Sequence, residues 1–341
     1  MIKHMTKLTG WTASLVALAA TASADVKVND YLSLNGYAAA AATYSDNTGP
    51  SLPTNPAGKN VSTLFNSGSN ELDSLKLAAV GKYGDFGGKL SFLYIPTRAG
   101  SNSGFEDVYA TYTKDEFTVT AGKFLSYLGY EAFDPNNMTQ LTYGTTIFAV
   151  PTYHTGAKVD YATKTWGAGL AVVDSVFAGS GFLQGDGDFK RLGTEAYVTY
   201  TGIDKLTLWL GGAYDNHNKN FVAAPTRTVA IIDVWASYAL NAKTTLAAEF
   251  DTEESVGKGY LGEVQYAFTD KFSGVARLSL KENAHGDSGT YYTLAPSYAL
   301  TSNLKIRGEV SYADSAEATN GAYGLLSSKG FFYGVQALFS F

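Results

Sequence analysis

The chain has 341 residues, no cysteine and a formal net charge of −6. Charged residues make up only 16% of it, against roughly 25% in an ordinary soluble domain. No cluster of lysines and arginines is present to neutralise nucleic-acid phosphates. The composition therefore argues against a nucleic-acid-binding protein, and the absence of cysteine excludes disulfides and thiolate metal sites.

The N-terminus has the three parts of a secretory signal peptide. Two lysines precede a short apolar run at 11–20, and small residues at 22–24 form a cleavage site. The apolar run is too short to cross a bilayer core of about 30 Å as a helix. We therefore expect residues 1–24 to be removed and residues 25–341 to form one exported domain.

The rest of the sequence predicts strands. In 205–215, for example, Leu206, Leu208 and Leu210 alternate with Thr207 and Trp209. A period of two places each set on one face of a sheet. We expect about sixteen strands, at 29–44, 71–83, 88–96, 105–114, 116–124, 153–163, 165–174, 192–201, 205–214, 228–240, 243–252, 258–268, 271–281, 289–300, 303–313 and 329–341.

Short and long connections alternate strictly between these strands. Turns such as 113–116 are short, whereas connections such as 45–69 and 314–328 are long, polar and rich in glycine, asparagine and serine. The rhythm predicts an all-β protein, a transmembrane antiparallel β-barrel with short periplasmic turns and long extracellular loops. A closed barrel leaves no backbone group unpaired in lipid. A soluble β-sandwich or β-helix also alternates, but explains neither the loop rhythm nor the N-terminus.

One connection, 124–152, carries a recognisable pattern. The run GKF…LGYE…FDPNN…P-x-YHTG resembles the putative β-barrel porin-2 family of OmpL-like outer-membrane proteins. The matching residues are Gly122, Lys123, Phe124, Gly129, Tyr130, Glu131, Asp134, Asn137, Pro151, His154 and Gly156. The likeness is specific over 118–161. It implies an outer-membrane barrel that acts as a diffusion channel, without an established substrate.

The same resemblance implies a position for this loop, the third of the long ones. In porins of this strand number the third loop folds into the lumen. We therefore expect residues 125–150 to fold inward, with the carboxylates of Glu131 and Asp134 at a constriction. The alternative is a lid over the barrel mouth. Loops longer than about 12–15 residues usually have a task or are disordered.

Strand parity places charged side chains in the lumen. An acidic wall is expected from Asp233, Glu249, Asp251 and Glu263, and a basic wall from Arg277, Lys305 and Arg307. Further charges are expected to point inward at Lys76, Asp107, Lys158, Asp160, Glu195 and Glu309. Opposed walls would orient polar solutes, with a weak preference for cations because acids outnumber bases. Alternatively, neighbouring charges simply pair off.

Neither catalysis nor metal binding is expected. After the signal peptide the histidines are His154, His217 and His285, and the trio of His285, Asp287 and Ser288 lies along one flexible loop, where a nucleophile–base–orienter chain does not generally form. The sequence GDGD at 185–188 lacks the further oxygen ligands of a calcium loop. We expect no cofactor, and we expect His154 to anchor the third loop by a hydrogen bond.

The C-terminal segment, 331–341, alternates apolar and mixed positions up to the last residue. We expect it to pair with the first strand and close the barrel. Phe339 and Phe341 resemble the terminal signal that the barrel assembly machinery recognises.

The sequence thus predicts an outer-membrane porin for passive diffusion of small hydrophilic solutes and ions. Its expected partners are outer-membrane lipids, the assembly machinery and those solutes, and a homotrimer is left open. The alternative is a non-channel surface protein, an adhesin or anchor with a plugged barrel.

Overall fold

The computed structural model describes residues 25–47, 59–62, 72–97, 100–144, 150–177, 192–218, 227–284, 286–315 and 329–341. The predicted signal peptide, the GDGD segment and His285 lie outside these ranges. Within them, no helix is long and apolar enough to cross a membrane.

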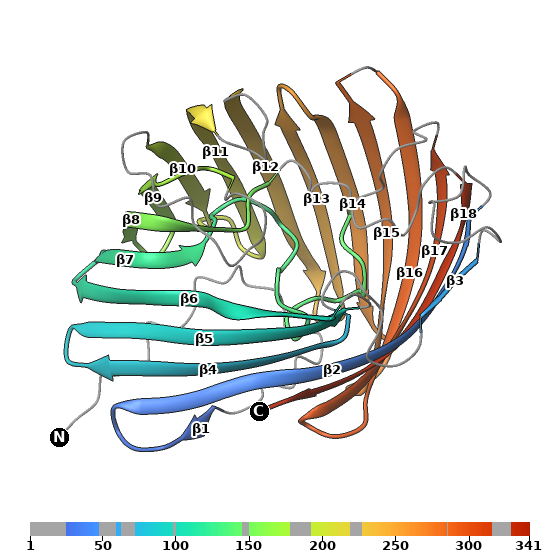
Figure 1. Cartoon of the computed structure of the whole chain (residues 1–341), viewed down its shortest axis with the longest axis horizontal. Coiled ribbons are helices and arrows are strands. Elements are labelled where there is room, and N and C mark those ends of the chain that lie inside the picture. Colours follow the sequence, from blue (N-terminus) through green and yellow to red (C-terminus); the bar gives the residue numbers. More distant parts are fainter. Residues whose placement is uncertain are drawn as a thin grey trace.

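The described chain is a succession of antiparallel strands (Figure 1). They are β1 (Val26–Lys27), β2 (Leu32–Asn47), β3 (Lys59–Ser62), β4 (Ser74–Tyr83), β5 (Phe86–Thr97), β6 (Gly100–Lys114), β7 (Phe117–Leu125), β8 (Tyr153–Ala162), β9 (Trp166–Val173), β10 (Gly193–Tyr200), β11 (Leu206–Asn218), β12 (Arg227–Asn241), β13 (Thr244–Glu253), β14 (Gly257–Ala267), β15 (Phe272–Asn283), β16 (Ser288–Ala299), β17 (Leu304–Ser315) and β18 (Lys329–Ser340).

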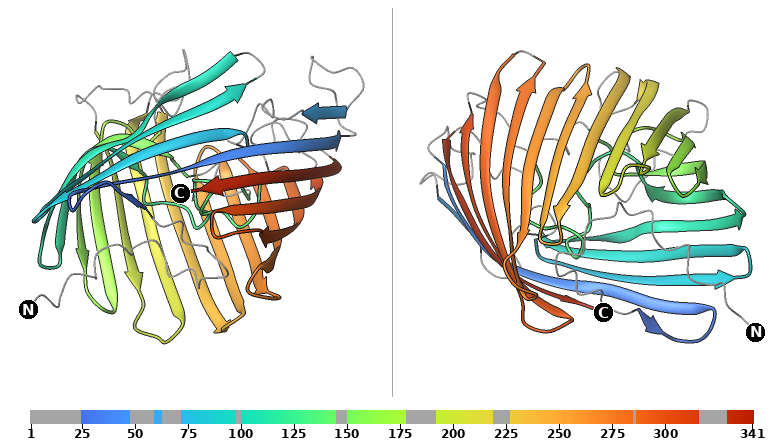
Figure 2. Two further views of the ribbon diagram at one scale, coloured as in Figure 1. Left: turned by 90° about the horizontal axis from the view of Figure 1, so that it is seen from below. Right: turned by 180° about the vertical axis from the view of Figure 1, so that it is seen from behind.

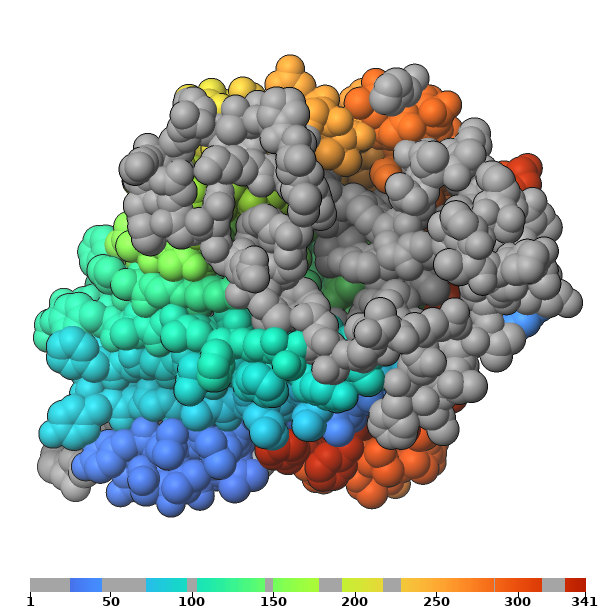
Figure 3. Space-filling view, viewed as in Figure 1, coloured from blue at the N-terminus to red at the C-terminus, as the bar shows by residue number. Residues whose placement is uncertain are grey.

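Sixteen of the described strands, β2 and β4 to β18, close into a barrel. Each pairs with the next along the chain, and β18 pairs with β2 to complete the ring. The short β1 and β3 are added to β2. The ribbon views show the strands wrapping around a common interior, and the space-filling view shows β2 and β4–β6 as a continuous wall (Figures 2 and 3). The predicted antiparallel β-barrel of about sixteen strands is confirmed.

The last strand shows how the sequence pattern builds this wall. Along β18 the side chains of Phe331, Tyr333 and Val335 are exposed on the outer face. Phe332 and Gln336 alternate with them and are buried inside. An apolar outer face and a polar interior are what a barrel in lipid requires. The alternation places the exposed aliphatic and aromatic residues of the other strands on the same lipid-facing surface.

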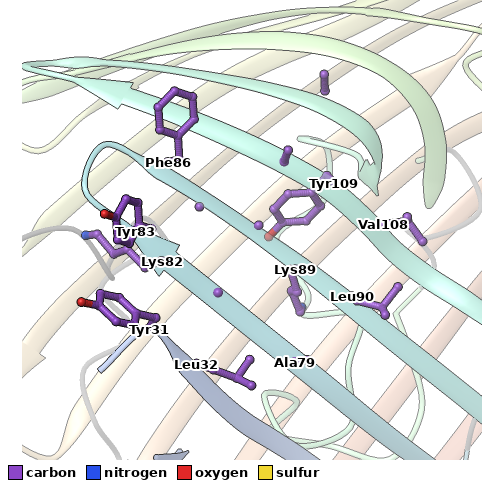
Figure 4. Close-up of a pocket in the computed structure, with 15 residues that line it drawn as sticks. Tyr31, Leu32, Ala79, Lys82, Tyr83, Phe86, Lys89, Leu90, Val108 and Tyr109 are labelled. Atoms are coloured by element: carbon purple, nitrogen blue, oxygen red, sulfur yellow. The ribbon is translucent and has the colours of Figure 1, made fainter. Parts of the chain in front are cut away.

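A girdle of aromatic residues surrounds the end of the barrel that carries the short turns. Aromatic rings approach one another there, with centroids 5.3 Å apart for Tyr31, which precedes β2, and Tyr83 of β4, and 5.1 Å apart for Phe86 of β5 and Tyr112 of β6. Figure 4 shows Tyr31, Tyr83 and Phe86 at this rim of β4 and β5. Aromatic belts of this kind sit at the interface between lipid and water.

The seam between the two ends of the chain is closed by backbone bonds. Gly36 N–H donates to the carbonyl oxygen of Phe341 (2.9 Å), and Phe341 N–H donates to that of Gly36 (3.0 Å). A Cβ at position 36 would lie 2.2 Å from the carbonyl oxygen of Lys76. Only glycine therefore lets β2 approach β4 and the C-terminus so closely.

Candidate functional site

The connection between β7 and β8, called the inner loop here (residues 126–152), crosses the interior of the barrel (Figures 1 and 2). It leaves and rejoins the wall at one point, because Leu125 and Tyr153 are register partners. Between these ends its described residues bond to inward-facing side chains of β4, β10, β12, β13, β14, β15 and β17.

Two carboxylates on β10 and β12 hold the first turn of the loop. Glu195 accepts hydrogen bonds from the Ser126 hydroxyl (2.8 Å) and from the Tyr127 N–H (3.1 Å). The next contact is made by Gly129, whose N–H donates to Asp233 at 2.6 Å. Each buried N–H of an irregular segment must find an acceptor, and a carboxylate is a strong one.

The following residue is bound by the next two strands. Tyr130 N–H donates to Glu249 of β13 at 2.6 Å, and the Tyr130 hydroxyl lies 3.3 Å from Glu263 of β14. Burial and the nearby Glu263 carboxylate raise the pKa of the Tyr130 phenol above its ordinary value. The hydroxyl therefore stays protonated and can act as a donor to Glu263.

An ion pair links the centre of the loop to β15. Arg277 binds Glu131, and it also donates to the carbonyl oxygen of Thr142 (2.7 Å). Glu131 in turn accepts hydrogen bonds from Gln140 and from the Gly144 N–H. The carboxylate that the sequence assigned to a constriction thus joins the two halves of the loop to the wall.

The tip of the loop is held by β4. The Lys76 ammonium lies 2.7 Å from Asp134 of the loop and 2.8 Å from Glu106 of β6, with Asp107 at 3.8 Å. Asp134 also begins a turn, because its carbonyl oxygen accepts from the N–H of Asn137 at 2.9 Å. The second predicted constriction carboxylate is therefore also paired with a cation of the wall.

The returning half of the loop is held by two residues of β17. Arg307 donates to the carbonyl oxygens of Pro135 and Met138, both at 2.8 Å. Glu309 accepts from the N–H groups of Leu141 (2.6 Å) and Thr142 (2.9 Å). One strand thus supplies a donor for the loop's carbonyls and an acceptor for its amides.

All the residues assigned to the two walls face the interior. Six of them, namely Asp233, Glu249, Asp251, Glu263, Arg277 and Arg307, are buried, and Lys305 is half-buried. Asp251 is the register partner of Asp233 and has no hydrogen-bond partner among the described residues. Lys305 has no ion-pair partner there either. The other five bind the inner loop, a role that the sequence analysis had not assigned to them.

Glu106 was missed because the chain departs from strict alternation at this point. The register of β5 against β6 shifts between Leu90 and Phe92, so Glu106 and the adjacent Asp107 are both buried. A bulge places two consecutive residues opposite one and breaks the period of two.

Gln336 of β18 is a second lumen residue that the sequence analysis did not assign. It accepts from Arg307 and donates to the carbonyl oxygen of Leu72 (2.8 Å), and a lone amide on the inner face of β18 was the available signal.

A row of aromatic rings lines the wall beneath the first half of the loop. Tyr197, Trp209 and Trp235 lie on consecutive strands, with ring planes within 10° and centroids 6.0 and 5.8 Å apart. A Cβ at Gly211 would lie 2.4 Å from the Trp209 ring. This glycine therefore leaves the space in which the indole lies along the wall.

Of the histidines, His154 has a defined setting next to the loop. Its Nε2 lies 3.3 Å from Glu195, the residue that binds the start of the loop, and its Nδ1 lies 3.3 Å from the carbonyl oxygen of Val176. It thus contacts the loop's anchor, and it makes no hydrogen bond to the described residues of the loop. Among the described residues, no group of three His, Cys, Asp or Glu side chains could hold a metal ion.

A cavity of about 1620 Å³ lies between the inner loop and the short-turn end of the barrel. We call it the vestibule. Its lining includes the loop residues Tyr127, Tyr130 and Phe133 on one side and Lys305 and Arg307 on the other. The rim is formed by short turns, for example 163–165.

Comparisons with known proteins agree with this architecture. A family model described as "Putative beta-barrel porin-2, OmpL-like" matches residues 31–341. No curated protein matches the chain.

Several solved structures are similar over most of the chain. The outer membrane channel DcaP of Acinetobacter baumannii is 13% identical with a TM-score of 0.61, covering 91% of this chain and 97% of that one. A trimer form of OmpT, an outer membrane protein of Vibrio cholerae, is 15% identical with a TM-score of 0.58, covering 91% and 99%. An anion-selective porin from Comamonas acidovorans is 14% identical with a TM-score of 0.57, also covering 91% and 99%. At these identities the likeness shows the fold alone.

Proposed function

The chain belongs to the putative beta-barrel porin-2, OmpL-like family, and on this premise we propose that it lets small hydrophilic solutes and ions diffuse passively through a lumen narrowed by the inner loop. The protein is an outer-membrane porin-type barrel. The inner loop is the observation that supports a narrowed lumen. It is bound to side chains on both sides of the interior, and protein atoms leave the vestibule beneath it open.

A constriction must keep its shape while solutes pass. Charged groups of the wall bind both the first half and the second half of the inner loop. Such charge-assisted hydrogen bonds are roughly twice as strong as neutral ones. Displacing the loop would remove most of the hydrogen bonds of the buried charges Arg307 and Glu309, which would keep only Gln336 and Ser311 as partners, and this is costly. These contacts support a fixed narrowing rather than a mobile plug.

A second candidate, a non-channel surface protein with a plugged barrel, is favoured by one observation. Leu128 and Val150 of the loop pack with Trp209 and Trp235 in a buried apolar cluster inside the barrel. Such packing closes part of the interior. The porin family and the channels among the similar structures favour the open, non-enzymatic reading.

Further aspects of this function are proposed on the same basis. Residues 1–24 direct export and are cleaved, and the assembly machinery reads Phe339 and Phe341. The trimer form among the similar structures supports a homotrimer. Small residues of the lipid-facing surface, such as Ala79, Gly81 and Ala110, line a shallow outer cavity of about 680 Å³ where another protomer or lipid could pack closely.

A swelling assay tests the proposed diffusion. The purified protein is reconstituted into liposomes that are placed in isotonic solutions of arabinose, glucose, sucrose and raffinose. We expect swelling rates that fall steeply with sugar size, because the loop sets a fixed opening. Heat-denatured protein is the control. Equal, baseline rates for all sugars with folded protein would support the plugged barrel.

A further inference from the structure

The cations that face the vestibule make no ion pairs with described carboxylates, unlike Lys76 and Arg277 elsewhere in the lumen. Lys305 lines the cavity and makes no ion pair with any described residue. Lys158 lines the opposite side, where its ammonium lies 4.4 Å from the ring centroid of Tyr127 and 4.8 Å from that of Phe124. No described carboxylate forms an ion pair with it.

Arg307 adds a third uncompensated cation. It lies two residues from Lys305 on the same face of β17, which places the two roughly 7 Å apart along the strand. The contacts of its guanidinium are carbonyl oxygens of the loop and the amide oxygen of Gln336, all of them neutral acceptors. Its positive charge is therefore not cancelled by a bound carboxylate.

The carboxylates of the same cavity are mostly engaged. Glu131 is paired with Arg277 and Asp134 with Lys76, and neither of these cations lines the vestibule. Asp160 accepts a hydrogen bond from the neutral Tyr197 hydroxyl at 3.2 Å and keeps its negative charge, which is one charge against the three cations Lys158, Lys305 and Arg307. Asp115 and Glu116 lie in a turn at the rim. Inside the vestibule the excess charge is thus positive, although the chain as a whole carries −6.

The side of the vestibule around Lys158 is aromatic. Tyr127 and Tyr197 are half-buried, line the cavity and contact each other, with ring centroids 4.6 Å apart. Trp209 continues the row next to Tyr197. Flat rings favour planar apolar groups, which stack on them, over bulky or hydrated groups.

From the excess positive charge and the aromatic side of the vestibule we infer that this cavity is a binding site for aromatic carboxylates, small anions that carry a planar ring. The carboxylate would lie near Lys158, and the ring would contact Tyr127 and Tyr197 on the same side, while Lys305 and Arg307 add positive charge across the cavity. The inference rests on the proposed porin function. It replaces the weak cation preference expected from the acidic wall, because Asp233, Glu249 and Glu263 hold the inner loop and none of the four wall acids lines the vestibule.

The test uses single-channel recordings of the full-length mature protein with three probe solutes. Benzoate has both features, cyclohexanecarboxylate has the charge without the planar ring, and benzyl alcohol has the ring without the charge. We expect benzoate to interrupt the current at concentrations about two- to tenfold lower than either of the others, since an aromatic contact and an ion pair each contribute modestly. A salt gradient should also show a preference for chloride over potassium.

Matched variants separate the two contributions. Lys158→Gln should reduce benzoate block roughly two- to fivefold, whereas Lys243→Gln, in a short turn outside the vestibule, should not change it. Tyr197→Leu should abolish the advantage of benzoate over cyclohexanecarboxylate, whereas Tyr197→Phe, which keeps the ring, should retain it.

The outcomes distinguish this inference from the proposed function. Steady conductance of KCl with equal block by all three solutes, or with a preference for potassium, would overturn the proposed aromatic-carboxylate binding site and leave the porin proposal standing. If folded protein gives no conductance at all, the porin proposal fails and the inference fails with it.

Discussion

Arg307 and Glu309 lie two residues apart on β17, and they bind opposite groups of one loop backbone. The same division of labour recurs around the barrel, where Glu195, Asp233 and Glu249 accept backbone N–H groups of the loop. Single charged residues of the lumen therefore act first as anchors. Their effect on solutes is indirect, because they fix the position of the loop. The cations that make no ion pair with a described residue, Lys158 and Lys305, are the ones free to act on a solute.

Substitution of Arg277 is the strictest test, among single residues, of whether lumen charges anchor the inner loop. Arg277→Met leaves Glu131 buried without its cation, and breaking one partner of a buried pair costs about 3–5 kcal/mol. We expect a lower temperature for heat-induced loss of the folded barrel on gels and a noisier, larger single-channel current. Lys258→Met is the control, because its pair with Glu282 is about half exposed. An unchanged current in Arg277→Met would contradict the anchor role.

The contact between Lys76 and Asp134 makes a separate prediction about the loop tip. In a cycle of Lys76→Met, Asp134→Asn and the double variant, we expect a coupling energy of about 0.5–3 kcal/mol for thermal unfolding. Lys76→Met should be the more harmful single change, because the buried carboxylate of Glu106 also loses Lys76, its ion-pair partner. Additive effects of the two single changes would show that the tip is not held by this pair.

The sequence predicted which of these residues face inward but not what they bind. Parity along a strand is a local property, so Asp233 and Glu249 could be assigned to the lumen correctly. Their partners, Gly129 and Tyr130, lie more than a hundred residues away in an irregular segment. No periodicity links such positions, and only the closed fold brings them together.

At the scale of elements, the strands agree with the sequence prediction to within a few residues. For example, β8 was expected at 153–163 and spans Tyr153–Ala162. The clear exceptions are local. The bulge that turns both Glu106 and Asp107 inward, and the short β3, follow from strand pairing across β5 and β2 rather than from the sequence of one segment.

The closing strand makes a prediction about assembly. Deleting Phe341 removes the backbone groups that bond to Gly36, and it removes the terminal aromatic residue. We expect the amount of folded, heat-modifiable barrel in outer-membrane fractions to fall strongly, while conductance for each assembled pore stays close to that of the wild type. Phe341→Tyr keeps both features and is the control. A normal yield from the deletion would contradict the assembly role.

At the scale of the whole molecule, the barrel wall and the inner loop contribute differently. The wall is stabilised by strand pairing that continues around the ring without an edge. The loop is attached to this wall through polar contacts and one apolar cluster. Since the wall does not depend on the loop for closure, the loop can be changed without abolishing the fold.

This independence allows the loop to be replaced cleanly. Leu125 and Tyr153 are register partners, and Ser126 N–H donates to the carbonyl oxygen of Thr152 at 2.6 Å. Residues 127–151 can therefore be replaced by a short Gly-Ser turn that continues the β7–β8 hairpin. The variant should still form a heat-modifiable barrel, because the strands and their pairing are unchanged.

Single-channel conductance of the wild type and this loop-replaced variant, recorded side by side in the same salt, tests the central claim most directly. If the inner loop narrows a water-filled lumen, the wild type gives steady openings and the variant gives openings of clearly higher conductance. Equal conductance in two folded proteins would contradict the constriction, and a silent wild type beside a conducting variant would identify a plugged barrel instead.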